Sequence, residues 1–197
     1  MEFDLTRKSC LVIIDMINGF IFEGSLSDPW INRCTKPIVK LVQTFIDNKQ
    51  PILAFCDSHS ENSCEFESFP LHCLSDTSES ELINALKPYA SNMKILLKNS
   101  TNGFVQPEFE NWFKQILPLD KMIITGCCTD ICVLQFALSV KGYINQHNLT
   151  TEIVVPRNCT ETFETSDHNR KQFNEMAYTL MINAGIKVVE NFRIEEK

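Results

Sequence analysis

Glycine, tryptophan and histidine are scarce in this sequence of 197 residues, which contains 6, 2 and 4 of them respectively. So few glycines, together with the absence of repeats and low-complexity segments, argue against a fibrous or disordered chain. No apolar run approaches the length of about 20 residues that a membrane-spanning helix needs. Cationic side chains are also in the minority, because 18 lysines and arginines face 25 acids and leave a net charge of −7. Nucleic acid and anionic membranes are therefore not expected as partners.

Cysteine, in contrast, is abundant, with nine residues. The odd number and the irregular spacing do not fit a disulfide framework. The first ten residues, MEFDLTRKSC, carry acids before the first apolar run, and this is not the pattern of an export signal. We therefore expect a cytoplasmic protein whose cysteines are reduced thiols.

Short apolar runs alternate with amphipathic segments along the whole chain. Six runs have the composition of strands that are buried on both faces: residues 10–15, 51–56, 94–97, 122–125, 151–155 and 186–189. Three helices are expected to begin at Pro37, Pro107 and Asp130. Two more are expected over about residues 79–86 and from a cap at Asp167 to about residue 183. Between them, the stretch that contains the turn signal Asn18-Gly19 is expected to be a loop.

This alternation of strands and helices predicts the fold class. It is typical of an α/β protein in which one central sheet is covered by helices on both faces. We expect a single domain over residues 1–197, built as a doubly wound three-layer α/β/α sandwich with a mostly parallel six-stranded sheet. In such sheets, sites lie at the carboxyl ends of the strands.

Residues 121–133, KMIITGCCTDICV, join a predicted strand directly to a predicted helix. Gly126 ends the strand, and Thr129 or Asp130 can cap the helix, which places Cys132 in the first helical turn. There the helix dipole and the unpaired N–H groups favour a thiolate and stabilise an oxyanion. Cys132 is thus a candidate nucleophile; the alternative is one more small buried residue.

Charged residues stand at the ends of three other predicted strands, namely Asp15, Asp57 and Lys98. A thiol, a carboxylate and an ammonium that converge at one sheet edge suit nucleophilic acyl transfer. Asp15, with a pKa raised by burial, would exchange protons, while Lys98 would hold Cys132 as the thiolate. The alternatives are a strand-end cap for Asp15 and a surface position for Lys98.

The polar segment of about residues 57–78 lacks periodicity and is longer than a connection requires, which makes it a functional-loop candidate. It contains Asp57, His59 and His72, with several glutamates between the two histidines. Two histidines and two carboxylates suit Zn²⁺, Fe²⁺ or Mn²⁺. The alternative is a polar loop whose scattered histidines and acids bind no metal.

Four stretches of this chain resemble motifs of the isochorismatase-like cysteine hydrolases and, within them, of the nicotinamidases. They are VIIDMINGF, DSH…FPLHC, LLKNSTNGF and TGCCTDICV, which lie between residues 10 and 133. The second resembles the metal loop that separates nicotinamidases from isochorismatases. The chain departs from the family pattern at Leu71, at Asp76-Thr77 and at Thr101, where a proline, a glycine-threonine pair and an aromatic residue are common.

The resemblance implies roles for particular residues. The implied catalytic triad is Asp15, Lys98 and Cys132; the implied oxyanion hole consists of the backbone N–H groups of Cys128 and Cys132, beside a cis peptide between Cys127 and Cys128. The implied metal ligands are Asp57, His59, Glu65 and His72, with Glu67 as the rival of Glu65. Phe20 and Phe69 match positions that lie on either side of the substrate ring.

The implied reaction is the hydrolysis of nicotinamide to nicotinate and ammonia through a thioester on Cys132, a step of NAD salvage, with pyrazinamide as a second substrate. The implied cofactor is one divalent transition metal, zinc ahead of iron or manganese, that binds the pyridine nitrogen. The alternatives are a related hydrolase of another small amide or N-carbamoyl compound, and a non-catalytic metal- or thiol-binding redox module. A small molecule is the expected partner, and assembly into a homo-oligomer is left open.

Overall fold

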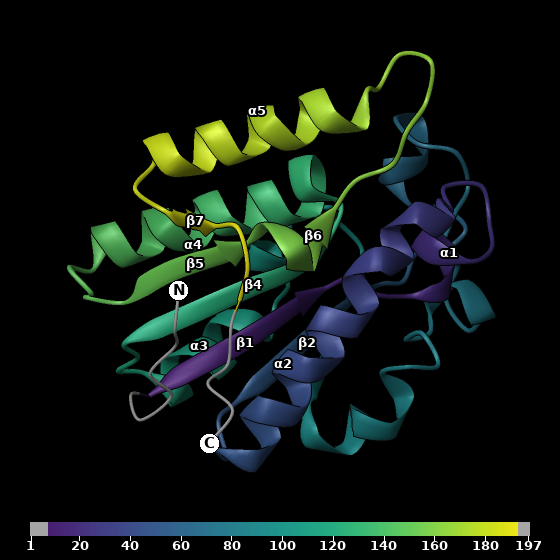
Figure 1. Ribbon diagram of the computed structural model, residues 1–197. Coiled ribbons are helices and arrows are strands. Elements are labelled where there is room, and N and C mark those ends of the chain that lie inside the picture. Colours follow the sequence, from purple (N-terminus) through teal and green to yellow (C-terminus); the bar gives the residue numbers. More distant parts are fainter. Residues whose placement is uncertain (1–7, 193–197) are drawn as a thin grey trace.

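A single sheet of seven strands forms the centre of the molecule (Figure 1). The computed structural model describes residues 8–192. Within them the strands are β1 (Ser9–Ile14), β2 (Ile52–Asp57), β3 (Lys94–Lys98), β4 (Lys121–Cys127), β5 (Glu152–Pro156), β6 (Thr160–Glu161) and β7 (Lys187–Val189). Their order is β3-β2-β1-β4-β5-β7, with β6 paired to β4, and each of these pairings is parallel.

Helices cover both faces of this sheet. The longer ones are α2 (Thr35–Asp47), α3 (Phe109–Ile116), α4 (Leu134–Gln146) and α5 (Arg170–Asn183). Leu11 and Ile13 of β1 belong to the hydrophobic core under α2, whereas Val12 and Ile14 belong to the core under α3, α4 and α5. The expected three-layer α/β/α architecture is confirmed; the sheet has a short strand, β6, that the sequence analysis did not predict.

The position of β1 creates a switch point in the sheet. From β1 the chain adds β2 and β3 on one side and then returns to place β4 on the other. All arrows in Figure 1 point toward the end of the molecule that carries the short helix α1 (Asn18–Ile21). Gly126 of β4 pairs with Ile14 of β1, and a Cβ atom on Gly126 would lie 1.9 Å from the Ile14 carbonyl oxygen. Glycine is therefore required where the two strands meet.

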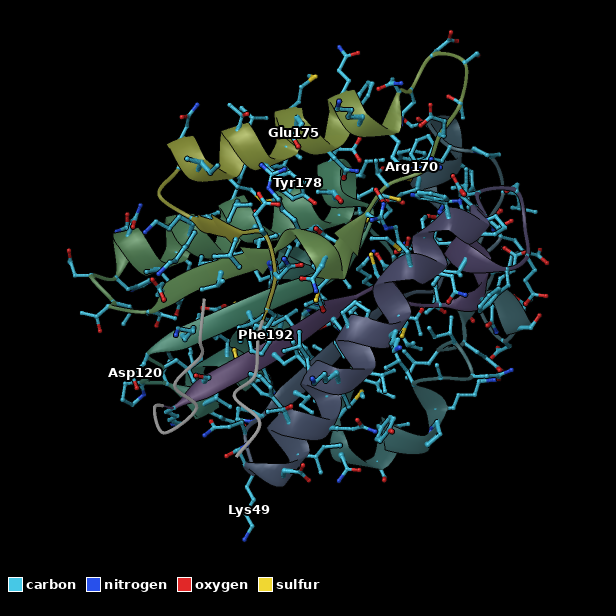
Figure 2. The ribbon with its side chains drawn as sticks, viewed as in Figure 1. Lys49, Asp120, Arg170, Glu175, Tyr178 and Phe192 are labelled. Carbon is cyan, nitrogen blue, oxygen red and sulfur yellow. The ribbon has the colours of Figure 1, made fainter. Side chains whose placement is uncertain are left out.

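Helix α5 is anchored over the same end of the sheet. Its residue Tyr178 is buried, and the phenol oxygen lies 2.8 Å from Thr160 Oγ1 at the start of β6. In Figure 2, Arg170 at the start of α5 lies far from Lys49 and Asp120, which mark the opposite end. The segment that leads into α5 thus reaches the carboxyl ends of the strands.

The prediction of a helix at residues 79–86 is wrong. The segment begins with one 3-10 turn, Ser78–Ser80, and continues as irregular backbone. Its main chain pairs with the segment after β1: the N–H of Asn18 donates to Glu81 O and the N–H of Ile83 to Met16 O. Tertiary backbone pairing and burial of Ile83 replace the intrahelical hydrogen bonds.

Other helix starts also differ from the expectation. Asn18-Gly19 opens α1 rather than a loop turn, and α2 begins at Thr35, before Pro37. Neither Thr129 nor Asp130 caps a helix, because the chain forms a π-helical turn, Thr129–Val133, ahead of α4. In α5 the cap is Asn169, whose Oδ1 accepts from the Gln172 N–H at 3.0 Å, whereas Asp167 is exposed.

Further 3-10 turns connect the elements: Pro29–Cys34, Cys64–Glu67, Lys87–Asn92, Gly103–Val105 and Arg157–Cys159. None of the helices in residues 8–192 combines the length and the hydropathy that crossing a bilayer requires. The expected lack of an export signal rests partly on residues 1–7, which lie outside the described residues. The single domain over residues 1–197 likewise stays a prediction.

Candidate active site

Four neighbouring strands bring together the three predicted catalytic side chains and one predicted metal ligand, Asp57. Asp15 follows β1, Asp57 ends β2, Lys98 ends β3, and Cys132 lies in the π-helical turn after β4. Asp15 has a positive φ of 51°, a conformation that aspartate adopts more readily than most residues. All four residues are buried. The predicted meeting of these strand ends is therefore present in the structure.

Lys98 lies between the two carboxylates and the thiol. Its Nζ is 2.9 Å from Asp15 Oδ2, forms an ion pair with Asp57 Oδ1, and lies 3.9 Å from Cys132 Sγ. The Asp57 N–H also donates to Asp15 Oδ1 at 3.0 Å. Burial alone would lower the pKa of Lys98, but the two carboxylates outweigh it and raise this pKa well above 10.5. Lys98 is thus a permanent cation.

Burial decides the protonation of the two groups that would exchange a proton. It raises the pKa of Asp15 to about 7, although Lys98 acts in the opposite direction. Burial also raises the pKa of Cys132 well above 9.0, and Lys98 offsets only part of this rise. This direction is opposite to the expectation that Lys98 and the helix dipole hold Cys132 as a thiolate, because the desolvation of the buried sulfur outweighs the attraction of Lys98. The raised pKa favours the thiol form of Cys132.

A carboxylate is close enough to accept the proton of that thiol. Ligand atoms of Asp15, Asp57 and Cys132 all lie within 4.8 Å of one another. Burial would raise the pKa of Asp57, but Lys98 and His59 lower it below 3.8. Asp57 therefore stays charged, and Asp15, with a pKa near neutrality, is the group suited to take and return a proton.

A second cluster consists of the four residues predicted as metal ligands. One ligand atom from each of Asp57, His59, Glu65 and His72 lies within 4.8 Å of the others. His59 Nε2 is 3.5 Å from Asp57 Oδ2 and 3.8 Å from Glu65 Oε2, and His72 Nε2 is 3.9 Å from Asp57 Oδ2. The rival, Glu67, is exposed and lies outside this cluster.

The chemistry of this cluster fits a divalent cation. His59 Nε2 and Glu65 Oε2 are buried and have no hydrogen-bond partner among the described residues. Burial would lower the pKa of His59, but Asp57 and Glu65 raise it, so this corner of the pocket favours positive charge. Two imidazoles and two carboxylates are common zinc, iron and manganese donors. The residues present therefore fit a metal.

Two carbonyl-type oxygens orient the imidazole rings of this cluster. Asn99 Oδ1 lies 2.8 Å from His59 Nδ1, and the Pro70 carbonyl oxygen lies 2.7 Å from His72 Nδ1. Each contact assigns the proton to Nδ1 and leaves Nε2 as the ligand atom. Asn99 was not expected at the site, although its position next to Lys98 at a strand end was a usable signal.

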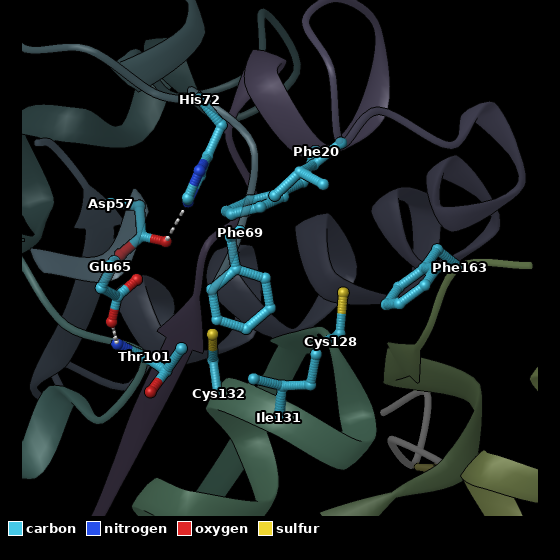
Figure 3. A pocket seen from close by; sticks show the side chains of 11 residues that line it. Phe20, Asp57, Glu65, Phe69, His72, Thr101, Cys128, Ile131, Cys132 and Phe163 are labelled. Carbon is cyan, nitrogen blue, oxygen red and sulfur yellow. Dashed lines mark hydrogen bonds and ion pairs between the residues drawn. The ribbon is translucent and has the colours of Figure 1, made fainter. Parts of the chain in front are cut away.

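An apolar pocket separates the thiol from the metal cluster (Figure 3). The residues that line it are Phe20, Leu26, Asp57, Glu65, Phe69, His72, Thr101, Cys128, Ile131, Cys132 and Phe163. The predicted ring-binding residues Phe20 and Phe69 both belong to this wall, with ring centroids 5.8 and 6.2 Å from that of His72. Three further lining residues were not expected: Leu26 and Phe163 come from segments without a motif, and Ile131 lies next to Cys132 in the π-helical turn.

The backbone after β4 has the cis peptide expected between Cys127 and Cys128. The carbonyl oxygen of Cys128 accepts hydrogen bonds from the N–H groups of Ile131 and Val133, both at 3.1 Å. This turn is compact and holds Cys132 on the pocket wall. The N–H groups of Cys128 and Cys132 stay predicted oxyanion donors.

The fold and this site together define a class of enzyme: a hydrolase on a doubly wound sheet, with a buried thiol and a candidate metal donor set at the carboxyl ends of the strands. Residues 9–189 match the isochorismatase domain, so the chain belongs to the isochorismatase family of hydrolases. It is 35% identical over 179 residues to Nicotinamidase 1 of Arabidopsis thaliana, covering 82% of this chain and 72% of that protein.

Solved structures agree with this assignment. The crystal structure of nicotinamidase PncA from Bacillus subtilis superposes with a TM-score of 0.78 at 27% identity, covering 93% of this chain and 99% of that one. The pyrazinamidase of Pyrococcus horikoshii in complex with zinc has a TM-score of 0.75 at 21% identity, covering 94% and 99% of the two chains. At that identity the second likeness concerns the fold.

Proposed function

We propose that this chain is a metal-dependent nicotinamidase, which hydrolyses nicotinamide to nicotinate and ammonia and accepts pyrazinamide as well. The observation that carries the proposal is the convergence of three features on one apolar pocket. These are a buried thiol, an acid–lysine pair beside it, and a donor set for a divalent cation. The similarity to the Arabidopsis nicotinamidase supports the choice of substrate.

The acylation step uses Cys132 and Asp15. Cys132 Sγ attacks the carboxamide carbon while Asp15 accepts the thiol proton. Asp15 then donates that proton to the amide nitrogen as the C–N bond breaks, so ammonia leaves and a thioester remains on Cys132. Because its pKa is about 7, Asp15 is suited to both transfers near neutral pH. Lys98 stays charged and stabilises the ionised form of Asp15.

The deacylation step reuses the same acid. A water that enters as ammonia leaves gives a proton to Asp15 and attacks the thioester carbonyl carbon. The C–S bond breaks, Asp15 returns the proton to sulfur, and the carboxylic acid formed loses its proton to solvent and departs as nicotinate. In both steps the negative charge on the carbonyl oxygen would be stabilised by the N–H groups of Cys128 and Cys132.

Asp57, His59, Glu65 and His72 would hold the cation, for which zinc is our first choice ahead of iron and manganese. When bound, it would supply a Lewis-acid contact for the pyridine nitrogen and positive charge beside Asp57. Phe20 and Phe69 would hold the ring from the pocket wall and exclude water from it.

The first experiment measures ammonia release from nicotinamide by the zinc-loaded wild type, by the chelated wild type, and by Cys132→Ala. The matched control is Cys64→Ala, which removes an exposed thiol outside the pocket. We expect turnover in wild type and Cys64→Ala, and its loss after chelation or in Cys132→Ala.

Two other results would contradict parts of this proposal. Activity that survives thorough chelation but not Cys132→Ala leaves a cysteine hydrolase and removes the role of the metal. A metal-loaded wild type that releases no ammonia from nicotinamide or pyrazinamide contradicts the proposed substrates, and another small amide then takes their place.

A further inference from the structure

His168 forms the centre of an aromatic stack beside the pocket. Its ring centroid lies 3.9 Å from that of Phe163 and 3.8 Å from that of Phe173, with interplanar angles of 12° and 23°. The histidine side chain is 12% exposed. No motif in the sequence marks this residue, and the catalytic steps derived above do not use it.

Both ring nitrogens of His168 contact segments of the active site. Nε2 lies 2.8 Å from Asp130 Oδ2, and Asp130 precedes Cys132 by two residues in the π-helical turn. Nδ1 lies 3.1 Å from the carbonyl oxygen of Phe163, whose side chain lines the pocket. A single side chain thus links the turn that carries the nucleophile to the segment that carries one pocket wall.

Asp130 depends on this link. Its side chain is only 10% exposed, and Oδ1 is buried with no hydrogen-bond partner in residues 8–192. A carboxylate at this depth that loses its partner carries an uncompensated desolvation cost. Removal of His168 is therefore expected to displace the turn around Asp130 as well as Phe163.

Phe163 lies on the side of the pocket away from the metal cluster. Figure 3 shows its ring beyond Cys128 and Ile131, whereas Asp57 and Glu65 lie on the opposite side. Phe163 belongs to no helix or strand, because it stands between β6 and α5 in a segment where the Thr165 N–H donates to His168 O at 3.1 Å. Its position therefore depends on contacts with neighbouring side chains, and His168 both stacks on its ring and lies 3.1 Å from its carbonyl oxygen.

We propose that His168 is a positioning residue that holds Phe163 as a wall and thereby limits the size of the amide that reaches Cys132. The inference rests on the proposed function for the identity of the substrate, and it adds a specificity device to it. The class of substrate admitted is an unsubstituted single-ring carboxamide. Substituents that extend away from the metal cluster are rejected by the Phe163 ring.

The test compares Phe163→Ala, which removes the wall, with His168→Leu, which removes both hydrogen bonds but keeps a bulky side chain. The matched control is His147→Leu, because His147 also contacts an aromatic ring, that of Tyr143, but is exposed and lies outside the pocket. The substrates are nicotinamide and its singly methylated derivatives. Each derivative carries one methyl group, placed on a different free ring carbon.

We expect the ratio of kcat/KM for the best methyl isomer to that for nicotinamide to rise about tenfold in Phe163→Ala and in His168→Leu, mainly through KM. The ratio should not change in His147→Leu. A folded His168→Leu protein with the wild-type ratio overturns the proposal, and so does an unchanged ratio in Phe163→Ala. If His168→Leu does not fold, Asp130→Asn decides the point, since it should move the ratio in the same direction.

A second readout separates this inference from the proposed function. The alkylation of Cys132 by iodoacetamide and by the bulkier N-ethylmaleimide is followed by mass spectrometry of the Cys132 peptide. The alkylation rate of N-ethylmaleimide relative to that of iodoacetamide should rise in Phe163→Ala and in His168→Leu, whatever amide the enzyme hydrolyses. If this relative rate rises while wild type does not hydrolyse nicotinamide, the proposed substrate is contradicted but the role of Phe163 as a wall is supported. If the relative rate does not rise, the role of Phe163 as a wall is contradicted.

Discussion

At the scale of single residues, Asp57 has two separate sets of contacts. Its Oδ1 pairs with Lys98, while its Oδ2 faces the Nε2 atoms of His59 and His72. The same carboxylate therefore belongs to the acid–lysine cluster around Cys132 and to the metal donor set. An amide at this position would keep the shape but lose the charge for both clusters at once.

Asp15 should leave a measurable trace in the pH dependence of stability. Its pKa is about 7 in the folded protein against an ordinary value of 3.8, so between these values the folded state holds a proton that the unfolded chain has lost. The free energy of unfolding of the metal-free protein should therefore fall as pH rises from about 4 to about 7, partly because of Asp15. Asp15→Asn should make this slope less negative.

The measurement is urea unfolding of chelated wild type and Asp15→Asn at several pH values in this range. Asp47→Asn, at the exposed end of α2, is the matched control and should reproduce the wild-type slope. Equal slopes for Asp15→Asn and wild type would show that Asp15 titrates at its ordinary pKa.

Asn99 gives a second prediction at this scale. It holds the Nδ1 atom of His59, and the loss of such an orienting contact typically weakens metal binding about 10- to 100-fold. We expect Asn99→Ala to show this loss in a calorimetric titration with zinc. Asn92→Ala, which also changes an exposed asparagine, should bind zinc as wild type does. Equal affinities for both variants would remove Asn99 from the orienting role.

At the scale of elements, periodicity predicted the strands and the long helices well, because burial on both faces leaves a continuous apolar run. It failed at residues 79–86, where Leu82, Ile83 and Leu86 are buried at helical spacing but the backbone pairs with the segment after β1. It also missed β6, which is only two residues long. Local patterns do not contain such long-range backbone pairing.

The site residues, too, could be predicted only where a local pattern marks their position. Asp15, Asp57, Lys98 and Cys132 could be placed because they stand at strand ends, where the fold rule brings residues together. Their roles, and those of the metal ligands, stay predictions. Phe163 and His168 could not be placed from the sequence, because an irregular segment between β6 and α5 brings them to the pocket.

Two glycines offer a prediction about elements. Gly126 has a φ of 111° and no room for a Cβ atom beside Ile14, so Gly126→Ala should lower the free energy of unfolding by more than about 2 kcal/mol. Gly142 lies inside α4 with nothing within 4 Å of its Cβ position, so Gly142→Ala should raise it by about 0.5–1 kcal/mol. Chemical unfolding of both variants checks the opposite signs; a stable Gly126→Ala protein would contradict the close contact of β1 and β4.

At the scale of the whole molecule, cation binding should stabilise the fold, because the donor residues join β2 to the segment that follows it. At a free zinc concentration 100 times the dissociation constant, the gain should be about 2.7 kcal/mol. It should vanish on chelation and be much reduced in His59→Asn. Thermal unfolding with and without zinc measures the gain, and an equal gain in His59→Asn would place the bound zinc elsewhere.

The central position of β1 also has a consequence for the order in which the enzyme is made. A ribosome releases Asp15, the candidate metal ligands and Lys98 first, and Cys132 follows later, after β4, which must still insert along the free side of β1. Phe163 and His168 follow later still. Until that insertion the nascent chain has the acids and the candidate metal ligands but not the proposed nucleophile, so under the proposed function catalytic competence is acquired late in synthesis.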